Sequence, residues 1–190
     1  NLNPMYTVDE LRALTADTGV STLFTFDMVL PNIRPLCQHV DITRVVVTRV
    51  TDYIEGFGQS TPRELELEEG WHHFSVLLEN TSSTRLPRID ISPNDPALIQ
   101  FTGGTTGLPK LVPRTHNDLI CASEFCARAW EMDIQDVCLL AGPIGHDLTF
   151  TKGFLGSVLT YGRCVFLDST EPDDICRAIE QERVSTIVWV

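Results

Sequence analysis

Short apolar runs rich in β-branched residues alternate with helix-like segments along most of the 190-residue chain. This alternation predicts an α/β fold with largely parallel sheets. The expected strands are residues 20–26, 44–48, 97–102, 136–141, 163–167 and 185–190. The expected helices are residues 7–17, 28–39, 71–78, 115–130, 149–161 and 172–183.

Local signals mark several helix ends. Thr7 and Glu10 have the spacing of a capping box, in which each residue satisfies a backbone N–H of the other. Gly19 is the expected stop of that helix, near Asp17. Thr115 is placed to cap a later helix, and Pro172 suits a first helical turn.

A polar stretch with three prolines, residues 80–96, is the expected linker between two parts of the chain. We expect a first α/β portion over residues 1–79 and a second over 97–190. Residues 52–70 lack periodicity and are expected to form a loop or an insertion. The apolar run at 185–190 favours a piece of a longer protein.

Charge, apolar runs and cysteine spacing limit the kinds of binding partner and the cellular location to be expected. A formal net charge of −12 disfavours nucleic acid as a partner. No apolar run is long enough to span a membrane. The six cysteines form no Cys-x-x-Cys pair, so neither a zinc site nor a redox motif is indicated. A reducing, cytoplasmic location is therefore expected.

The most informative segment is FTGGTTGLPK, residues 101–110. Its glycines allow a tight turn that points successive backbone N–H groups into one space. Its threonines add hydroxyl donors and its lysine adds a positive charge. The set suits a polyphosphate, and its members are Thr102, Gly103, Gly104, Thr105, Thr106, Gly107 and Lys110.

Two common phosphate motifs do not fit this segment. The P-loop requires Ser or Thr after its lysine, whereas Leu111 follows Lys110. The dinucleotide pattern G-x-G-x-x-G fails on the glycine spacing. The segment TGGTTGLPK instead resembles the signature loop of adenylate-forming enzymes. These include acyl-CoA synthetases, aryl-acid AMP ligases, peptide-synthetase adenylation domains and luciferases.

Two segments of the chain resemble different branches of that superfamily. The segment KLVPRTH, residues 110–116, is similar to the aryl-acid AMP ligases. The segment NPMYTVDEL, residues 3–11, is similar to the long-chain fatty-acid CoA ligases.

The resemblance implies that the chain is part of the large N-terminal domain of an ATP- and Mg²⁺-dependent ligase. It would activate a small carboxylic acid as an acyl-adenylate and pass the acyl group to a thiol. CoA or the phosphopantetheine of an acyl or aryl carrier protein would supply the thiol. The loop residues would bind ATP. The superfamily's C-terminal catalytic lysine has no counterpart here, so we expect no catalytic residue in this chain and no activity from it alone. Three alternatives stay open: a non-catalytic interaction module, an amino-acid-type adenylation domain and an unrelated nucleotide-binding domain.

A second motif, GPIGHD at residues 142–147, resembles the part of the superfamily that lies near the acyl site. His146 and Asp147 are therefore candidate substrate-binding residues. An aspartate at this place holds an amino group in the amino-acid branch, whereas the aryl branch often has asparagine. Asp147 is equally well placed to cap a helix beginning near Thr149. Lys152 is a candidate phosphate contact, although an exposed helix position is its default interpretation.

Overall fold

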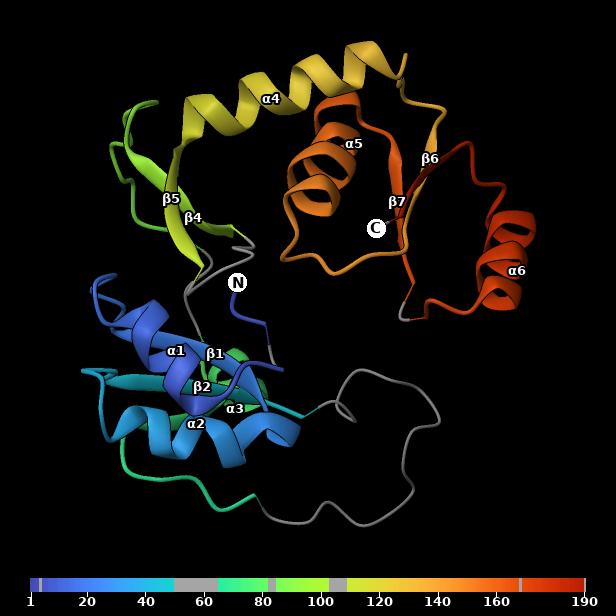
Figure 1. Cartoon of the computed structure of the whole chain (residues 1–190). Helices are drawn as coiled ribbons and strands as arrows, with labels where there is room; N and C mark the ends of the chain where they lie inside the picture. Colours follow the sequence, from blue (N-terminus) through green and yellow to red (C-terminus); the bar gives the residue numbers. More distant parts are fainter. Residues whose placement is uncertain (4, 50–64, 82–84, 103–108, 168, 190) are drawn as a thin grey trace. The chain divides into compact units, whose positions relative to one another are not determined.

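The structure, a computed structural model, describes residues 1–3, 5–49, 65–81, 85–102, 109–167 and 169–189 (Figure 1). The chain forms two compact units. Among the residues described, those from 2 to 89 form the N-terminal unit, and those from 90 to 102 and from 109 to 189, together with Asn1, form the C-terminal unit. The assignment of residues 80–96 as a linker stays a prediction.

The N-terminal unit contains a three-stranded parallel sheet in the order β1-β2-β3. Its strands are β1 (Thr22–Phe26), β2 (Arg44–Thr48) and β3 (Trp71–His73). Its helices are α1 (Val8–Thr15), the 3₁₀ turn η1 (Asp27–Val29), α2 (Leu30–Cys37) and α3 (Phe74–Glu79).

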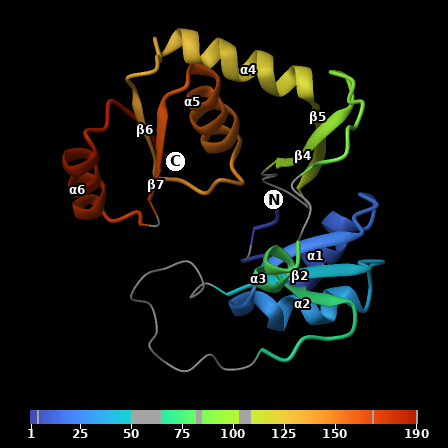
Figure 2. The ribbon, with the colours of Figure 1, turned by 180° about the vertical axis from the view of Figure 1, so that it is seen from behind.

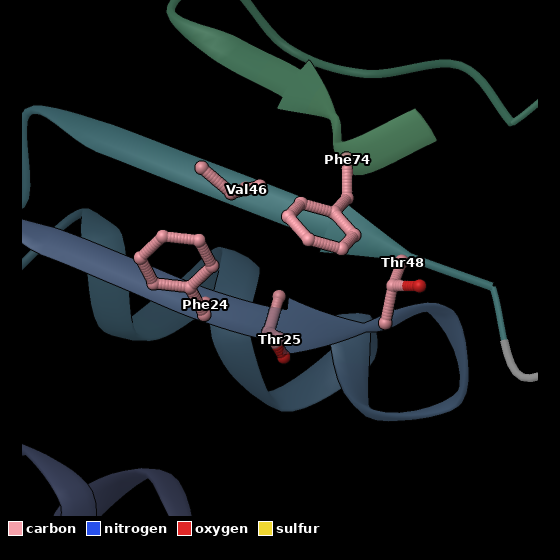
Figure 3. A pocket seen from close by; sticks show the side chains of 5 residues that line it. All are labelled: Phe24, Thr25, Val46, Thr48 and Phe74. Carbon is pink, nitrogen blue, oxygen red and sulfur yellow. The ribbon is translucent and has the colours of Figure 1, made fainter. Parts of the chain in front are cut away.

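Helices α1 and α2 cover one face of this sheet. Leu11 of α1 and Leu36 of α2 pack with Val45 and Val47 of β2 in one buried cluster. Because side chains alternate along a strand, Val46 faces the other side. There a hollow of about 390 Å³ is lined by Phe24, Thr25, Val46, Thr48 and Phe74 (Figure 3).

The start of α1 follows the capping-box prediction. Glu10 N donates to Thr7 Oγ1 at 3.3 Å, and Thr7 N donates to Glu10 Oε2 at 2.8 Å. The helix ends at Thr15, two residues before the predicted end. Gly19 lies beyond it with a φ of +64°, a left-handed conformation that glycine adopts without a Cβ clash.

One element of this unit was predicted wrongly. A helix was expected over residues 71–78, but Trp71–His73 forms strand β3 and the helix begins at Phe74. Trp71, His72 and His73 pair in parallel with Val45, Val46 and Val47. The pairing depends on a strand more than twenty residues away, so a local pattern does not contain it.

The C-terminal unit begins with an antiparallel hairpin and continues into a parallel sheet in the order β7-β6-β8. The hairpin strands are β4 (Pro96–Thr102) and β5 (Lys110–Thr115). After them come α4 (His116–Ala129), β6 (Val137–Leu140), a π-helix η3 (Leu148–Phe154), α5 (Leu155–Thr160), β7 (Arg163–Phe166), α6 (Pro172–Glu182) and β8 (Thr186–Val188). Figure 2 shows α4 running from β5 toward β6.

Strand β6 is the centre of this unit and is buried on both faces. Cys138 and Leu140 pack with Ala127 of α4 on one face. Leu139 packs with Ile175 of α6 on the other face. Such two-sided burial matches the continuous apolar run from which this strand was predicted.

The helix expected over residues 115–130 is confirmed, but the strand that precedes it was not predicted. Strand β5 follows the glycine-rich segment, and the helix begins only at His116. Pro113 lies within β5, where its missing N–H is tolerated because a two-stranded hairpin leaves one side of each strand unpaired. The sheets are thus parallel apart from this hairpin, and the α/β fold class is confirmed.

Candidate functional site

The glycine-rich segment joins two paired strands. Thr102, the last residue of β4, is paired in register with Lys110, the first residue of β5. Opposed Cα atoms in an antiparallel pair lie about 4.5–5.5 Å apart, so the two ends of the segment are held together. Gly103, Gly104, Thr105, Thr106 and Gly107 lie outside the described residues.

Helix α4 starts where the hairpin ends. Asp118 N donates to Thr115 Oγ1 at 3.1 Å, and Thr115 N donates to Asp118 Oδ2 at 3.0 Å. Hydrogen bonds from the backbone and side chain of Thr115 lower the pKa of Asp118. This reciprocal cap, predicted from Thr115, fixes the helix relative to strand β5.

His146 and Asp147 lie just before the π-helix η3. His146 is exposed, and its Nδ1 accepts a hydrogen bond from Leu148 N at 3.3 Å. Asp147 occupies the N-cap position of η3, but its side chain makes no capping hydrogen bond. The helix-cap interpretation of Asp147 is therefore wrong, because other groups engage this carboxylate.

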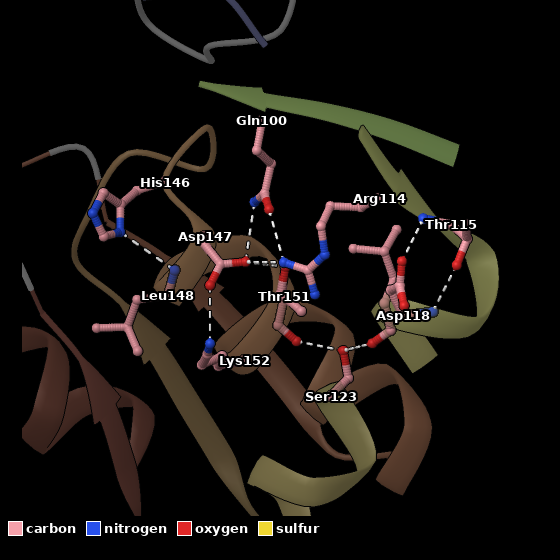
Figure 4. A network of polar contacts seen from close by, with 11 residues as sticks. Gln100, Arg114, Thr115, Asp118, Ser123, His146, Asp147, Leu148, Thr151 and Lys152 are labelled. Carbon is pink, nitrogen blue, oxygen red and sulfur yellow. Dashed lines mark hydrogen bonds and ion pairs between the residues drawn. The ribbon is translucent and has the colours of Figure 1, made fainter. Parts of the chain in front are cut away.

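Four side chains converge on Asp147 (Figure 4). Its Oδ1 accepts from Gln100 Nε2 at 3.0 Å and from Thr151 Oγ1 at 2.8 Å. Lys152 Nζ lies 2.9 Å from Oδ2, and Arg114 Nη1 lies 3.5 Å from Oδ1. Arg114 Nη1 also donates to Gln100 Oε1 at 3.1 Å. We call Gln100, Arg114, Asp147, Thr151 and Lys152 the Asp147 cluster.

The π-helix explains why both Thr151 and Lys152 reach the same carboxylate. They follow Asp147 by four and five residues. In an α-helix, with 3.6 residues per turn, a residue five positions on points well away from the first. A π-helix closes its turn between residues i and i+5, so the fifth residue returns to the same face.

The electrostatics of the cluster favour an ionised Asp147. Burial alone would raise the pKa of Asp147, but it is outweighed. Hydrogen bonds from Lys152, Thr151 and Gln100 and the charge of Lys152 lower the pKa to about 2. Lys152 and Arg114 both pair with the carboxylate of Asp147, and the charge of Arg114 also acts on Asp118, whose pKa it helps to lower. Asp147 is thus already paired with cations of this chain.

The default interpretation of Lys152 as an exposed helix residue was wrong. Its side chain is 28% exposed and paired with Asp147. Gln100 and Thr151 were not predicted as site residues from the sequence, and Arg114 entered only as part of the KLVPRTH resemblance. Gln100 lies on a strand and gave no motif signal. Thr151 follows Asp147 by four residues, an ordinary helical spacing that could have indicated the contact, whereas the contact of Lys152 required knowledge of the π-helix.

Ser123 joins α4 to the π-helix. It is fully buried, and its Oγ lies 2.6 Å from Thr151 O and 2.7 Å from Leu119 O. The carbonyl of Thr151 is thereby held by α4 while its hydroxyl binds Asp147 (Figure 4). The helix that carries Asp147 is consequently fixed from two sides.

No group of three or more His, Cys, Asp or Glu side chains suited to a metal ion occurs among the residues described. Mg²⁺ binding stays a prediction. Within the same residues, no helix combines the length and the apolar character needed to cross a membrane.

Comparisons with known proteins agree with the resemblance. Triostin synthetase I of Streptomyces triostinicus is 39% identical over 82% of this chain and 30% of its own length. A long-chain-fatty-acid–CoA ligase of Bacillus subtilis is 30% identical over 70% of this chain and 26% of its own. The apo structure of MbtA from Mycobacterium smegmatis superimposes with a TM-score of 0.78 at 26% identity, covering 97% of this chain and 32% of that one.

The chain thus spans less than a third of the length of these relatives. A sequence model of AMP-binding enzymes matches residues 1–190. The expectation drawn from TGGTTGLPK is confirmed: the chain belongs to the AMP-binding enzyme family.

Proposed function

We propose that this chain supplies the pyrophosphate-holding part of an enzyme that activates a carboxylic acid with ATP. A substrate carboxylate oxygen attacks the α-phosphorus, the bond from that phosphorus to the bridging oxygen breaks, and pyrophosphate leaves. The product is an acyl-adenylate. A thiol, from CoA or a carrier protein's phosphopantetheine, then attacks the acyl carbon and AMP leaves.

The observation that carries this proposal is the in-register pairing of Thr102 with Lys110. It gives the glycine-rich segment two fixed ends and puts an ammonium-bearing residue at one of them. Negative charge grows on the departing pyrophosphate during the reaction. Preorganised N–H groups, hydroxyls and a lysine near that charge lower the barrier without reorganising. We assign this role to Thr102, Gly103, Gly104, Thr105, Thr106, Gly107 and Lys110.

No nucleophile from the protein is required. The carboxylic acid provides the attacking oxygen, so the protein's task is to position the reactants and to offset charge. Mg²⁺ bound with ATP would supply further charge neutralisation. The motif at residues 142–147 would line the acyl side of the site, with His146 exposed at its end.

Both a fatty acid and an aryl acid fit the resemblances at the two ends of the chain. The Bacillus subtilis relative acts, by its name, on long-chain fatty acids. The segment KLVPRTH favours an aryl acid instead. We propose a carboxylic acid of one of these two classes as the substrate.

The test is carboxylate-dependent exchange of pyrophosphate into ATP by the full-length protein, with aryl, fatty and amino acids as substrates. We expect exchange with an aryl or a fatty acid. The 190-residue chain, assayed alone, should give none. Absence of exchange with every acid would contradict the proposal, and adding CoA or a carrier protein to the active pair would identify the acceptor.

A further inference from the structure

We propose that Asp147 is a positioning residue that fastens the β4–β5 hairpin to the start of the π-helix, and that it does not pair with an amino group on the substrate. The kinetic part of this inference rests on the proposed function. The structural part, a coupling between the hairpin and the helix, does not.

The carboxylate of Asp147 has little capacity left for a substrate. An ionised carboxylate offers about four lone-pair positions on its two oxygens. Gln100, Thr151 and Arg114 approach Oδ1, and Lys152 approaches Oδ2. A substrate ammonium would have to displace Lys152, which is half-buried.

Charge opposes an ammonium as well. Lys152 and Arg114 already pair with Asp147, and Arg114 also interacts with Asp118. An ammonium brought to Asp147 would meet Lys152 and Arg114 at close range, and partial burial strengthens the repulsion between these cations. A substrate without an amino group meets no such penalty. The geometry therefore disfavours the amino-acid-type alternative.

The partners of Asp147 come from both strands of the hairpin. Gln100 lies on β4, two residues before Thr102, and Arg114 lies on β5, four residues after Lys110. The two are joined to each other through Gln100 Oε1 and Arg114 Nη1 at 3.1 Å. Asp147 thus holds the two strands that carry both ends of the glycine-rich segment.

A positioning role predicts a particular kinetic pattern. Loosening the hairpin would misplace the groups that hold ATP phosphates, and a misplacement of about 1 Å can cost roughly a hundredfold in rate. The KM for ATP and pyrophosphate, or kcat, should change. The KM for the carboxylic acid should stay nearly constant, because Asp147 does not touch it.

The experiment measures these constants by pyrophosphate exchange in full-length D147A, D147N and Q100A. We expect D147A to lower kcat/KM for ATP roughly ten- to hundredfold. D147N should recover part of that loss, because its carbonyl still accepts from Gln100 and Thr151. Q100A should act in the same direction as D147A. The control E182Q removes a surface ion pair with Arg163 in the same unit and should match the wild type.

A rise confined to the KM of the carboxylic acid in D147A would overturn the inference. So would a D147A-specific loss of exchange with an amino acid that the wild type activates well. D147N serves as the milder variant if D147A folds poorly, and the same pattern of constants applies to it.

A second measurement does not depend on activity. The melting temperatures of full-length wild type, Q100A, D147A and the double variant form a cycle. Because Gln100 and Asp147 share a hydrogen bond, the double variant should melt at a higher temperature than the sum of the single losses predicts. Q100A combined with E182Q should be additive. Additivity of Q100A and D147A would overturn the inference, even if no carboxylic acid supports exchange.

Discussion

Lys152 follows Asp147 by five residues, and its Nζ lies 2.9 Å from Asp147 Oδ2. The pair exists because residues Leu148–Phe154 form a π-helix, in which the fifth residue returns to the same face. Single π-helical turns within helices are frequently found at functional sites. Here the turn begins directly after the GPIGHD motif, which the family resemblance places near the acyl site.

The first prediction concerns Lys110. Replacing it with methionine keeps most of the side-chain length but removes the charge proposed to offset the departing pyrophosphate. We expect kcat for pyrophosphate exchange by the full-length protein to fall about 10²–10³-fold, the cost typical of losing one preorganised electrostatic group. R177Q is the matched control, since Arg177 is an exposed cation on α6 paired with Asp174. Equal activity of K110M and wild type would contradict the role of Lys110.

The second prediction follows from the pKa of Asp147, about 2 in the folded chain against an ordinary 3.8. Because the folded-state pKa is the lower one, the folded protein binds this proton less tightly than the unfolded protein. The resulting stabilisation is fully present above pH 3.8 and is lost as the pH falls toward 2. D147N lacks this titration. The difference in melting temperature between wild type and D147N should therefore narrow as the pH falls from 6 to 3. Over that range the wild type loses part of the stabilisation from Asp147, and D147N has none to lose. A constant or widening difference would refute the assignment.

The third prediction compares two glycines. A Cβ on Gly153 would lie 2.5 Å from Leu140 Cδ2 and 3.0 Å from Val188 Cγ2, both in the core. G153A should therefore destabilise the protein by about 1–3 kcal/mol, the usual cost of overpacking. On Gly156 the nearest atom would be Met132 Sδ at 3.6 Å, an ordinary contact.

G156A is the matched control for that substitution. Alanine is favoured over glycine in a helix by about 1 kcal/mol, so G156A should melt at or above the wild-type temperature. Equal melting temperatures for the two variants would show that the approach of the helix to β6 and β8 does not depend on Gly153.

The fourth prediction concerns Ser123. S123A removes the hydroxyl that joins α4 to the carbonyl of Thr151 at a fully buried position. Loss of a buried hydrogen-bond partner costs about 1–3 kcal/mol. T160V is the control, since the partly buried Thr160 hydroxyl bonds the Gly156 carbonyl of its own helix at 3.1 Å. Thermal unfolding should show a larger loss for S123A, and an equal or larger loss for T160V would contradict the prediction.

Much of the fold was predictable because its signals are local. The capping boxes of Thr7 and Thr115 depend on residues three positions apart. Strands β2 and β6 are short, continuous apolar runs, and such a run is by itself a signal of a buried strand. The family could be predicted from TGGTTGLPK, because all residues of this signature lie in one uninterrupted stretch of the chain.

The sequence by itself determined the alternation of strands and helices, the helix caps and the family. Only the tertiary structure decided that Trp71–His73 is a strand, that a second strand follows the glycine-rich segment, and that Asp147 is engaged by Gln100 and Arg114. Each of these rests on partners distant in sequence or on a helix type that departs from 3.6 residues per turn. A pattern within one segment contains no information on such partners, because the contacts between the segments contribute to stability only once the segments have packed together.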